Sequence, residues 1–179
     1  MKKQISKATL GFRHLIIKVI SPTVYKHIKT CDPLPRGVVQ VIKKKFSNKP
    51  LMGVEIGVAE GIHAESILKT LNIQKLYLID PYKSFLHYST KQVMQLFLNA
   101  TRRLNPYRNK IVWIKKRSEE AVDDVPNGLD FVYIDGNHDF EYVKKDIELY
   151  YPKIRDEGVL GGHDFSMDLE GWSKQLLIL

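Results

Sequence analysis

Carboxylate and imidazole side chains follow several of the short apolar segments of this sequence. Asp135 comes directly after the apolar run 129–134, His138 follows three residues later, and His163 and Asp164 come after the run 159–162. If these runs are neighbouring strands, two carboxylates and one or two imidazoles converge. Such a set suits a hard or borderline divalent cation, which would also relieve the repulsion between the carboxylates. The alternative is that the two aspartates cap turns and that His138 caps the next helix.

A glycine turn interrupts the sequence LMGVEIGVAEGIHA, residues 51–64. A short apolar run leads to Gly57 and an apolar-periodic segment follows Gly61, which predicts a strand, a turn and a helix. Glu55 stands two residues before Gly57. Glycines at such a turn permit positive φ and let a ligand approach the backbone, and the helix that begins there directs free N–H groups to the same place.

A second apolar run, 76–79, ends on Asp80, 19 residues after Gly61. An acidic residue at this offset holds a ribose hydroxyl in nucleotide-binding βαβ units. The glycine turn and Asp80 together favour nucleotide binding, and the alternative is an ordinary βα turn of any α/β domain.

The apolar runs also define the scaffold that must bring these residues together. They predict strands at 51–56, 76–79, 111–114, 129–134 and 159–162, with helices at 38–46, 63–71, 92–104, 118–122 and 141–151. Asp156–Gly158 is predicted to form the turn before the last strand. This alternation favours an α/β fold, a Rossmann-like, doubly wound and mainly parallel sheet of about five strands with helices on both faces. Ligands of such sheets bind beyond the carboxyl ends of the strands, where the polar residues stand.

Length and composition indicate one globular domain with a short appendage. The chain has 179 residues, of which 44% are hydrophobic and 27% charged, so a sizeable core is expected. The single cysteine, Cys31, excludes an internal disulfide and fits a reducing compartment, so we expect a cytoplasmic protein. We expect neither a transmembrane segment nor a signal peptide.

Positive charge is concentrated in the first fifty residues. Residues 1–50 hold twelve Lys or Arg and one acid, Asp32, a formal charge of +11, whereas residues 51–179 carry −3. We therefore predict a basic helical N-terminal arm or cap at 1–50 and a sheet domain at 51–179. The arm is either a solvated helical face or a contact for an acidic partner, namely anionic lipid, nucleic acid or a phosphorylated substrate. Nucleic acid ranks low because the arm has few aromatic residues to stack on bases.

Several of these segments together carry a resemblance to a known family. They are VEIGVAEG with Glu55, LYLID with Asp80, the step Arg117-Ser118-Glu119, YIDGNHDFEYVKKDI and EGVLGGHDF. Between Leu51 and Phe165 the chain resembles the class I S-adenosylmethionine-dependent methyltransferases. More narrowly, it is similar to a small bacterial group akin to the macrocin-type sugar O-methyltransferases.

The resemblance implies which residues bind S-adenosylmethionine. Glu55, Gly57 and Gly61 would line the amino-acid and ribose part of the cofactor. Asp80 would hold the ribose hydroxyls, and Arg117 and Ser118 would lie beside the adenine.

The resemblance also implies a reaction centre for methylation of a hydroxyl on a small-molecule acceptor. Asp135 would lie close to the transferred methyl group and also bind a divalent metal ion such as Mg²⁺. His163 and Asp164 would complete the metal site. His138 would act as the base or orient one.

The chain departs from the family at its C-terminal end. Class I methyltransferases add two further strands after the fifth, and only 15 residues follow Asp164 here. We therefore expect a sheet without the usual final two strands, and an apolar edge. The apolar residues 176–179 could cover this edge or pair with a second copy of the chain. The alternative is a vestigial nucleotide-binding protein without turnover. A nicotinamide-dependent oxidoreductase is less favoured, because Gly57 and Gly61 are spaced G-x-x-x-G rather than G-x-G-x-x-G.

Overall fold

The computed structural model describes residues 35–84 and 88–163. Backbone contacts divide the chain into two units, Met1–Arg36 and Gly37–Leu179, and the fold below is that of the second unit. Asp164 and most of the predicted basic arm lie outside the described residues. No helix in the described part of the chain has the length and apolar character that a bilayer crossing requires.

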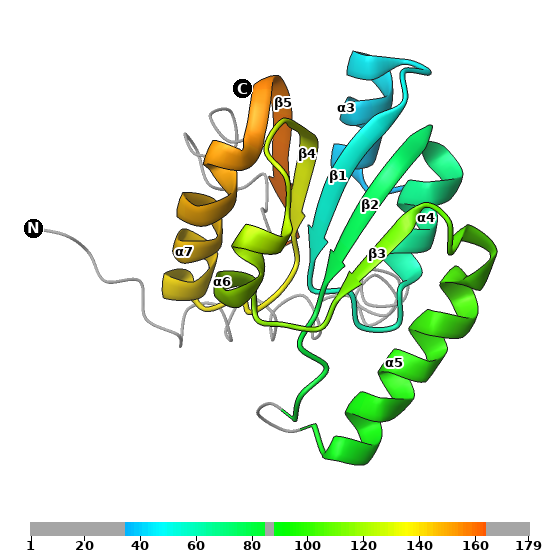
Figure 1. Cartoon of the computed structure of the whole chain (residues 1–179), viewed down its shortest axis with the longest axis vertical. Helices are drawn as coiled ribbons and strands as arrows, with labels where there is room; N and C mark the ends of the chain where they lie inside the picture. Colours follow the sequence, from blue (N-terminus) through cyan, green and yellow to red (C-terminus); the bar gives the residue numbers. More distant parts are fainter. Residues whose placement is uncertain (1–34, 85–87, 164–179) are drawn as a thin grey trace, which may run out of the picture. The chain divides into compact units, whose positions relative to one another are not determined.

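Five parallel strands form one sheet (Figure 1). Their order is β3-β2-β1-β4-β5, and their bounds are β1 Leu51–Ile56, β2 Ile73–Ile79, β3 Ile111–Ile114, β4 Leu129–Ile134 and β5 Ile154–Gly162. The chain moves outward from β1 to β3 and then returns to place β4 on the other side of β1. This order confirms the Rossmann-like, doubly wound fold predicted from the sequence. The crevice where the order reverses, between β1 and β4, is the usual ligand site of such sheets.

Helices cover both faces of the sheet (Figure 1). One face carries α3 (Gly37–Phe46), α4 (Ile62–Thr70) and α5 (Thr90–Leu104), and the other carries α6 (Ser118–Ala121) and α7 (Phe140–Tyr150). Short 3₁₀ turns follow three of them, at Asn105–Tyr107, Val122–Asp124 and Tyr151–Lys153.

Side chains that alternate along each strand divide the core into two layers. In β1, Leu51 packs with the helices α3, α4 and α5, whereas Val54 and Ile56 pack with α6 and α7. Phe131 and Val132 divide in the same way in β4. Each fully buried aliphatic side chain contributes about 1.5–3 kcal/mol. Strands that are apolar on both faces are therefore expected at the centre of a parallel sheet.

Among the strands, two boundaries differ from the prediction. β2 begins at Ile73, three residues before the expected start, and β5 runs through the predicted turn at Asp156–Gly158. Glu157 there has φ 64°, and the β4–β5 register jumps from Leu129↔Ile154 to Phe131↔Val159. The turn-forming residues therefore make a bulge inside a strand, because pairing with β4 continues on both sides of it.

Asp130 ties three strands together at the opposite end from the crevice. Its Oδ2 accepts a 2.7 Å hydrogen bond from the N–H of Met52 in β1, and its Oδ1 accepts one of 2.7 Å from Nε of Arg155 in β5. The β1–β2 and β4–β5 ladders are irregular here. The Asp130 carboxylate accepts a hydrogen bond from a donor on β1 and from one on β5.

Candidate active site

A cavity of about 310 Å³ opens at the carboxyl ends of β1, β2 and β4. Its volume lies at the lower end of the range typical of ligand sites, roughly 300–1,000 Å³. The predicted site residues that line it are Gly57, Asp80, Arg117, Ser118 and Asp135.

Gly57 brings the ends of β1 and β4 together. It has φ 86°, and a Cβ at this position would overlap the carbonyl oxygen of Asp135. The N–H of Gly57 donates to Ile79 O at 2.8 Å, and the N–H of Asp135 donates to Ile56 O at 2.7 Å. Only glycine fits both the backbone conformation and the close approach.

Gly61 has a different role from Gly57. It caps α4 in the left-handed conformation, with φ 71°. A Cβ there would lie 3.1 Å from Cδ1 of Leu104 in α5. Gly61 does not line the cavity, and its small size serves the packing of α4 against α5.

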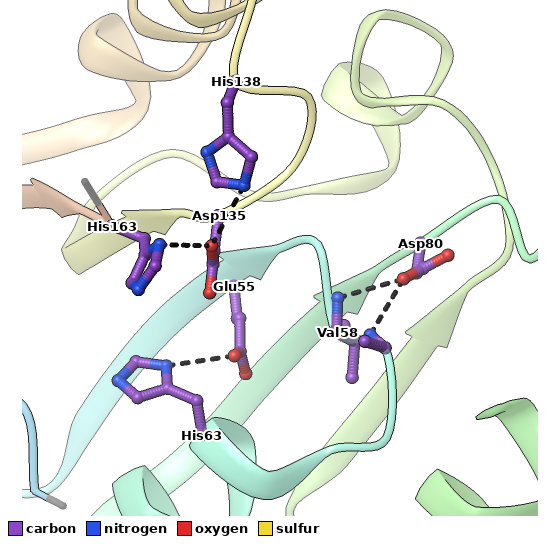
Figure 2. Close-up of polar contacts among 8 residues, drawn as sticks. Glu55, Val58, His63, Asp80, Asp135, His138 and His163 are labelled. Atoms are coloured by element: carbon purple, nitrogen blue, oxygen red, sulfur yellow. Dashed lines mark hydrogen bonds and ion pairs between the residues drawn. The ribbon is translucent and has the colours of Figure 1, made fainter. Parts of the chain in front are cut away.

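Asp80 fastens the turn after β1 to the end of β2 (Figure 2). Its Oδ2 accepts hydrogen bonds from the N–H groups of Val58 and Ala59, both at 3.0 Å, and its Oδ1 accepts one from the N–H of Tyr82 at 2.9 Å. A carboxylate can accept about four hydrogen bonds. The group can therefore hold the turn and still accept a ligand hydroxyl.

Tyr82 and Ala59 hold a strained backbone beside Asp80. Both are left-handed, with φ 44° and 46°, and the Tyr82 hydroxyl donates to Ala59 O at 2.9 Å. The Tyr82 ring packs against Phe97 at 4.8 Å between ring centroids. Burial, and then the negative charge of Asp80, raise the pKa of the Tyr82 phenol far above its usual value, so it stays a neutral donor. Strain of this kind persists where surrounding contacts fix it, often at functional sites.

Glu55 lies beneath the cavity wall rather than in it. It is 1% exposed, and its Oε1 is 3.1 Å from Nδ1 of His63 (Figure 2). The His63 ring lies 4.0 Å from the ring of Tyr133, centroid to centroid. Glu55 does not line the cavity, and its Oε1 faces His63 of α4 instead.

Asp135, His138 and His163 come together at the ends of β4 and β5 (Figure 2). Oδ1 of Asp135 is 3.8 Å from Nε2 of His138 and 3.5 Å from Nδ1 of His163, and one ligand atom from each residue lies within 4.8 Å of the others. Ligands about 2.0–2.1 Å from a tetrahedral metal ion are about 3.4 Å apart. A small shift would therefore let the three atoms share a cation.

Ser118 and Arg117 stand at the cavity end formed by α6 and α7. Ser118 begins α6, and its carbonyl oxygen accepts a 2.8 Å hydrogen bond from the Tyr150 hydroxyl. The Arg117 guanidinium lies 3.8 Å from Oε1 of Glu119, and both residues line the cavity.

Asp146 of α7 also lines this end of the cavity, and sequence reasoning did not select it. Its side chain is 4% exposed. Burial is the main cause that raises the pKa of the Asp146 carboxyl, a hydrogen bond from Ser118 opposes it, and the charge of Glu119 adds to it. The available signal was an acid within the apolar stripe that Val143, Ile147 and Tyr150 form along the helix.

Comparison with known proteins gives one family match. A family described as "Methyltransferase domain" matches residues 54–165, which is more than half of the chain. An uncharacterised protein of Acanthamoeba polyphaga mimivirus is 30% identical over 145 residues, which cover 78% of this chain and 62% of that protein.

Solved structures share the fold at low sequence identity. An rRNA methylase from Streptococcus thermophilus is 12% identical with a TM-score of 0.56, over 76% of this chain and 75% of that one. Spermidine synthase from Thermotoga maritima is 14% identical with a TM-score of 0.50, over 68% of this chain and 40% of that one. The chain thus covers less than two thirds of the viral protein and of the synthase.

The segment that matches the family contains the Gly57 turn, Asp80 and Asp135 with its two histidines, all at one end of a five-stranded parallel sheet. The chain therefore belongs to the methyltransferase-domain family, and its fold is that of the class I S-adenosylmethionine-dependent methyltransferases.

Proposed function

We propose that this chain methylates a hydroxyl of a small molecule, such as a sugar, with S-adenosylmethionine as the donor and a divalent cation as a helper. The observation that carries the proposal is the approach of Asp135, His138 and His163 to one another, with Asp135 in the wall of the cavity that Gly57 and Asp80 also line. The resemblance to macrocin-type enzymes supports an oxygen acceptor.

The residues around the cavity fit an adenosyl ligand. Asp80 keeps acceptor capacity for ribose hydroxyls beside its three backbone hydrogen bonds. Gly57 lines the cavity, and its lack of a side chain lets the end of β4 with Asp135 lie against the same turn. Arg117 and Ser118 would lie against the base.

Methyl transfer requires alignment of the acceptor and removal of its proton. When bound, S-adenosylmethionine supplies an electrophilic methyl group for in-line displacement by the acceptor oxygen. Asp135 would hold the acceptor hydroxyl in line with the cavity. His138, whose Nε2 is 3.8 Å from Asp135, would take the proton.

The donor set also fits a divalent cation. Asp135 and His163 would be ligands, and Asp164, outside the described residues, is the predicted third. Carboxylates suit Mg²⁺, whereas imidazole nitrogens suit Zn²⁺ and Fe²⁺. When bound, the cation would make a coordinated hydroxyl more acidic.

Calorimetric titration with S-adenosylmethionine and S-adenosylhomocysteine, with and without Mg²⁺ or Zn²⁺, tests the binding part of the proposal. We expect saturable binding of both nucleosides, and a cation that binds wild type but not His163→Ala. Nucleoside binding without transfer to any of a panel of small hydroxyl acceptors would favour the alternative, a nucleotide-binding protein of this fold without turnover.

Asp135→Ala tests the reaction part. Loss of the group that positions the acceptor should lower methyl transfer by at least about 100-fold and change the affinity for S-adenosylhomocysteine by much less. Asp156→Ala, which removes an exposed carboxylate on β5, is the matched control and should keep wild-type transfer. Normal turnover by Asp135→Ala would show that the assignment is wrong.

A further inference from the structure

Three segments of the chain lie at the end of the sheet opposite the cavity, where β1, β2 and β3 begin (Figure 1). They are residues 43–50, 69–75 and 105–111, and none of them contains Asp or Glu. Together they hold eight basic residues, namely Lys43, Lys44, Lys45, Lys49, Lys69, Lys75, Arg108 and Lys110. We call this set of eight residues the basic face.

Hydrogen bonds hold the three segments side by side. Nδ2 of Asn72 in the second segment donates to Asn48 O in the first at 2.7 Å. Nζ of Lys75 in the second segment donates to Asn109 O in the third at 3.3 Å. Basic residues that are far apart in the sequence are therefore brought onto one surface, which the charge count of the first fifty residues does not reveal.

Most of this charge reaches solvent. The side chains of the basic face are exposed except for that of Lys75, which is half-buried. Glu65 pairs with Lys69 at 2.8 Å and so offsets one of the eight charges. The exposed acids Asp156 and Glu157 stand at the amino end of β5, on the other half of the sheet. The half over β1 to β3 thus keeps a net positive charge.

The composition of the basic face indicates which kind of partner it fits. No large apolar side chain is exposed in the three segments, all of which the structure describes. Protein interfaces usually have an apolar or aromatic centre, and proteins that bind single-stranded nucleic acid stack bases on aromatic side chains. Seven of the eight residues are lysines, which act as point charges rather than as the planar donors of arginine. Summed lysine charge of this kind is typical of attraction to anionic lipid.

We propose that the basic face binds the surface of a bilayer that contains anionic phospholipid. Close to such a surface, each Lys or Arg strengthens binding by roughly fivefold. The cavity opens at the carboxyl ends of the strands, at the other end of the sheet (Figure 1). The bound protein would therefore keep its candidate active site open to the aqueous solution.

Sedimentation of the full chain with vesicles of phosphatidylserine and phosphatidylcholine tests the proposal. The double variant Arg108→Gln/Lys110→Gln should bind roughly 25-fold more weakly than wild type, because two charges are lost. Both residues lie outside the first fifty, so the basic N-terminal arm alone predicts no such loss. Lys43→Gln/Lys44→Gln should lower the affinity by a similar factor.

Two control variants separate the charge of this face from other effects. Lys144→Gln/Lys145→Gln makes the same change of charge on α7, where the two side chains are 55% and 53% exposed, and it should bind like wild type. Arg108→Lys/Lys110→Arg exchanges the two side chains and keeps their charge. It should also bind like wild type, which would show that charge and not a specific contact carries the binding.

Several results would overturn the proposal. They are absence of vesicle binding by wild type, unchanged binding in both Gln pairs of the basic face, and an equal loss in Lys144→Gln/Lys145→Gln. Loss of binding in the charge-keeping exchange would also contradict it. Tighter binding of duplex RNA than of vesicles, lost in the same Gln pairs, would assign the basic face to nucleic acid instead.

Discussion

The cavity depends on single residues whose size or charge cannot be exchanged without cost. Gly57 and Gly128 illustrate this. Their backbone conformations are similar, with φ 86° and 81°, but the atoms around them differ. A Cβ on Gly128 would meet nothing within 4 Å, whereas one on Gly57 would overlap the backbone of Asp135. The same substitution at the two positions therefore separates backbone strain from steric overlap.

We expect Gly57→Ala to lower the free energy of unfolding by about 3 kcal/mol or more, since left-handed strain and overlap add. Gly128→Ala should cost about 1–2 kcal/mol, because only the strain applies. Urea unfolding measures both. Equal losses would contradict the close approach between Gly57 and Asp135.

The buried carboxyl of Asp146 should make stability depend on pH. Its folded-state pKa is raised above the ordinary value of 3.8, mainly by burial. Below that value the group is neutral in both states and carries no penalty. As the pH rises through the folded-state pKa, the folded state loses stability relative to a neutral side chain.

Urea unfolding of wild type and Asp146→Asn at pH 4 and pH 7 checks this sign. The difference in unfolding free energy should shift in favour of Asp146→Asn at pH 7, by about 1.4 kcal/mol for each unit of raised pKa. A constant difference, or a shift toward wild type, would be inconsistent with the burial of this group.

At the scale of elements, the strands hold the site because contacts join them at both ends of the sheet. The contacts at the two ends are of different kinds. At the carboxyl ends, the Gly57 turn and Asp80 join β1 to β2 and β4. At the amino ends, Asp130 bonds Met52 of β1 and Arg155 of β5. The register near Asp130 is irregular. The Asp130 side chain therefore accepts hydrogen bonds where a regular ladder would use backbone groups.

Asp130→Ala should lower the unfolding free energy by about 1–3 kcal/mol, because the part-buried Met52 N–H loses its acceptor. Asp124→Ala is a suitable comparison. It removes a surface ion pair with Lys116, whose side chains are 40% and 49% exposed, and should cost less than about 1 kcal/mol. If Asp130→Ala costs no more than Asp124→Ala, the amino ends of the strands do not depend on this carboxylate.

At the scale of the whole molecule, the excess of positive charge and the candidate active site lie in different parts of the sequence. The first fifty residues carry +11 and the remainder −3. A basic segment of this kind binds anionic surfaces through its summed charge, and the attraction weakens as salt screens it. The division at residue 50 and the cytoplasmic location remain predictions.

We expect the full chain to bind vesicles that contain anionic phospholipid and not vesicles of neutral lipid. Binding should fall steeply between about 0.05 and 0.5 M salt, because the Debye length shortens. Sedimentation with vesicles measures it, and neutral vesicles at equal lipid concentration are the control. Equal binding to both kinds of vesicle would argue against an electrostatic contact.

The sequence predicted the order of elements well because buried strands and amphipathic helices leave local patterns. It also placed Asp80, Asp135, His138 and His163 at strand ends, since the end of an apolar run can be seen in the sequence. Asp164 lies outside the described residues, so its role as a ligand remains untested.

The features that the sequence did not predict depend on contacts between different elements of the fold. The bulge in β5 resembles a turn locally, and only its pairing with β4 shows that the strand continues. Glu55 contacts His63 of α4 and does not line the cavity, and its assignment to the cofactor stays a prediction. Asp146 stands within the apolar stripe of α7, but its position in the cavity wall depends on packing against residues outside this helix.

The three backbone hydrogen bonds to Asp80 have a consequence for how quickly a ligand can be captured. The loop that would receive the ligand is already clamped in place, so association need not wait for a segment to fold, and little chain entropy is lost on contact. Weakening this clamp should slow ligand association more than it changes the contacts in the finished complex.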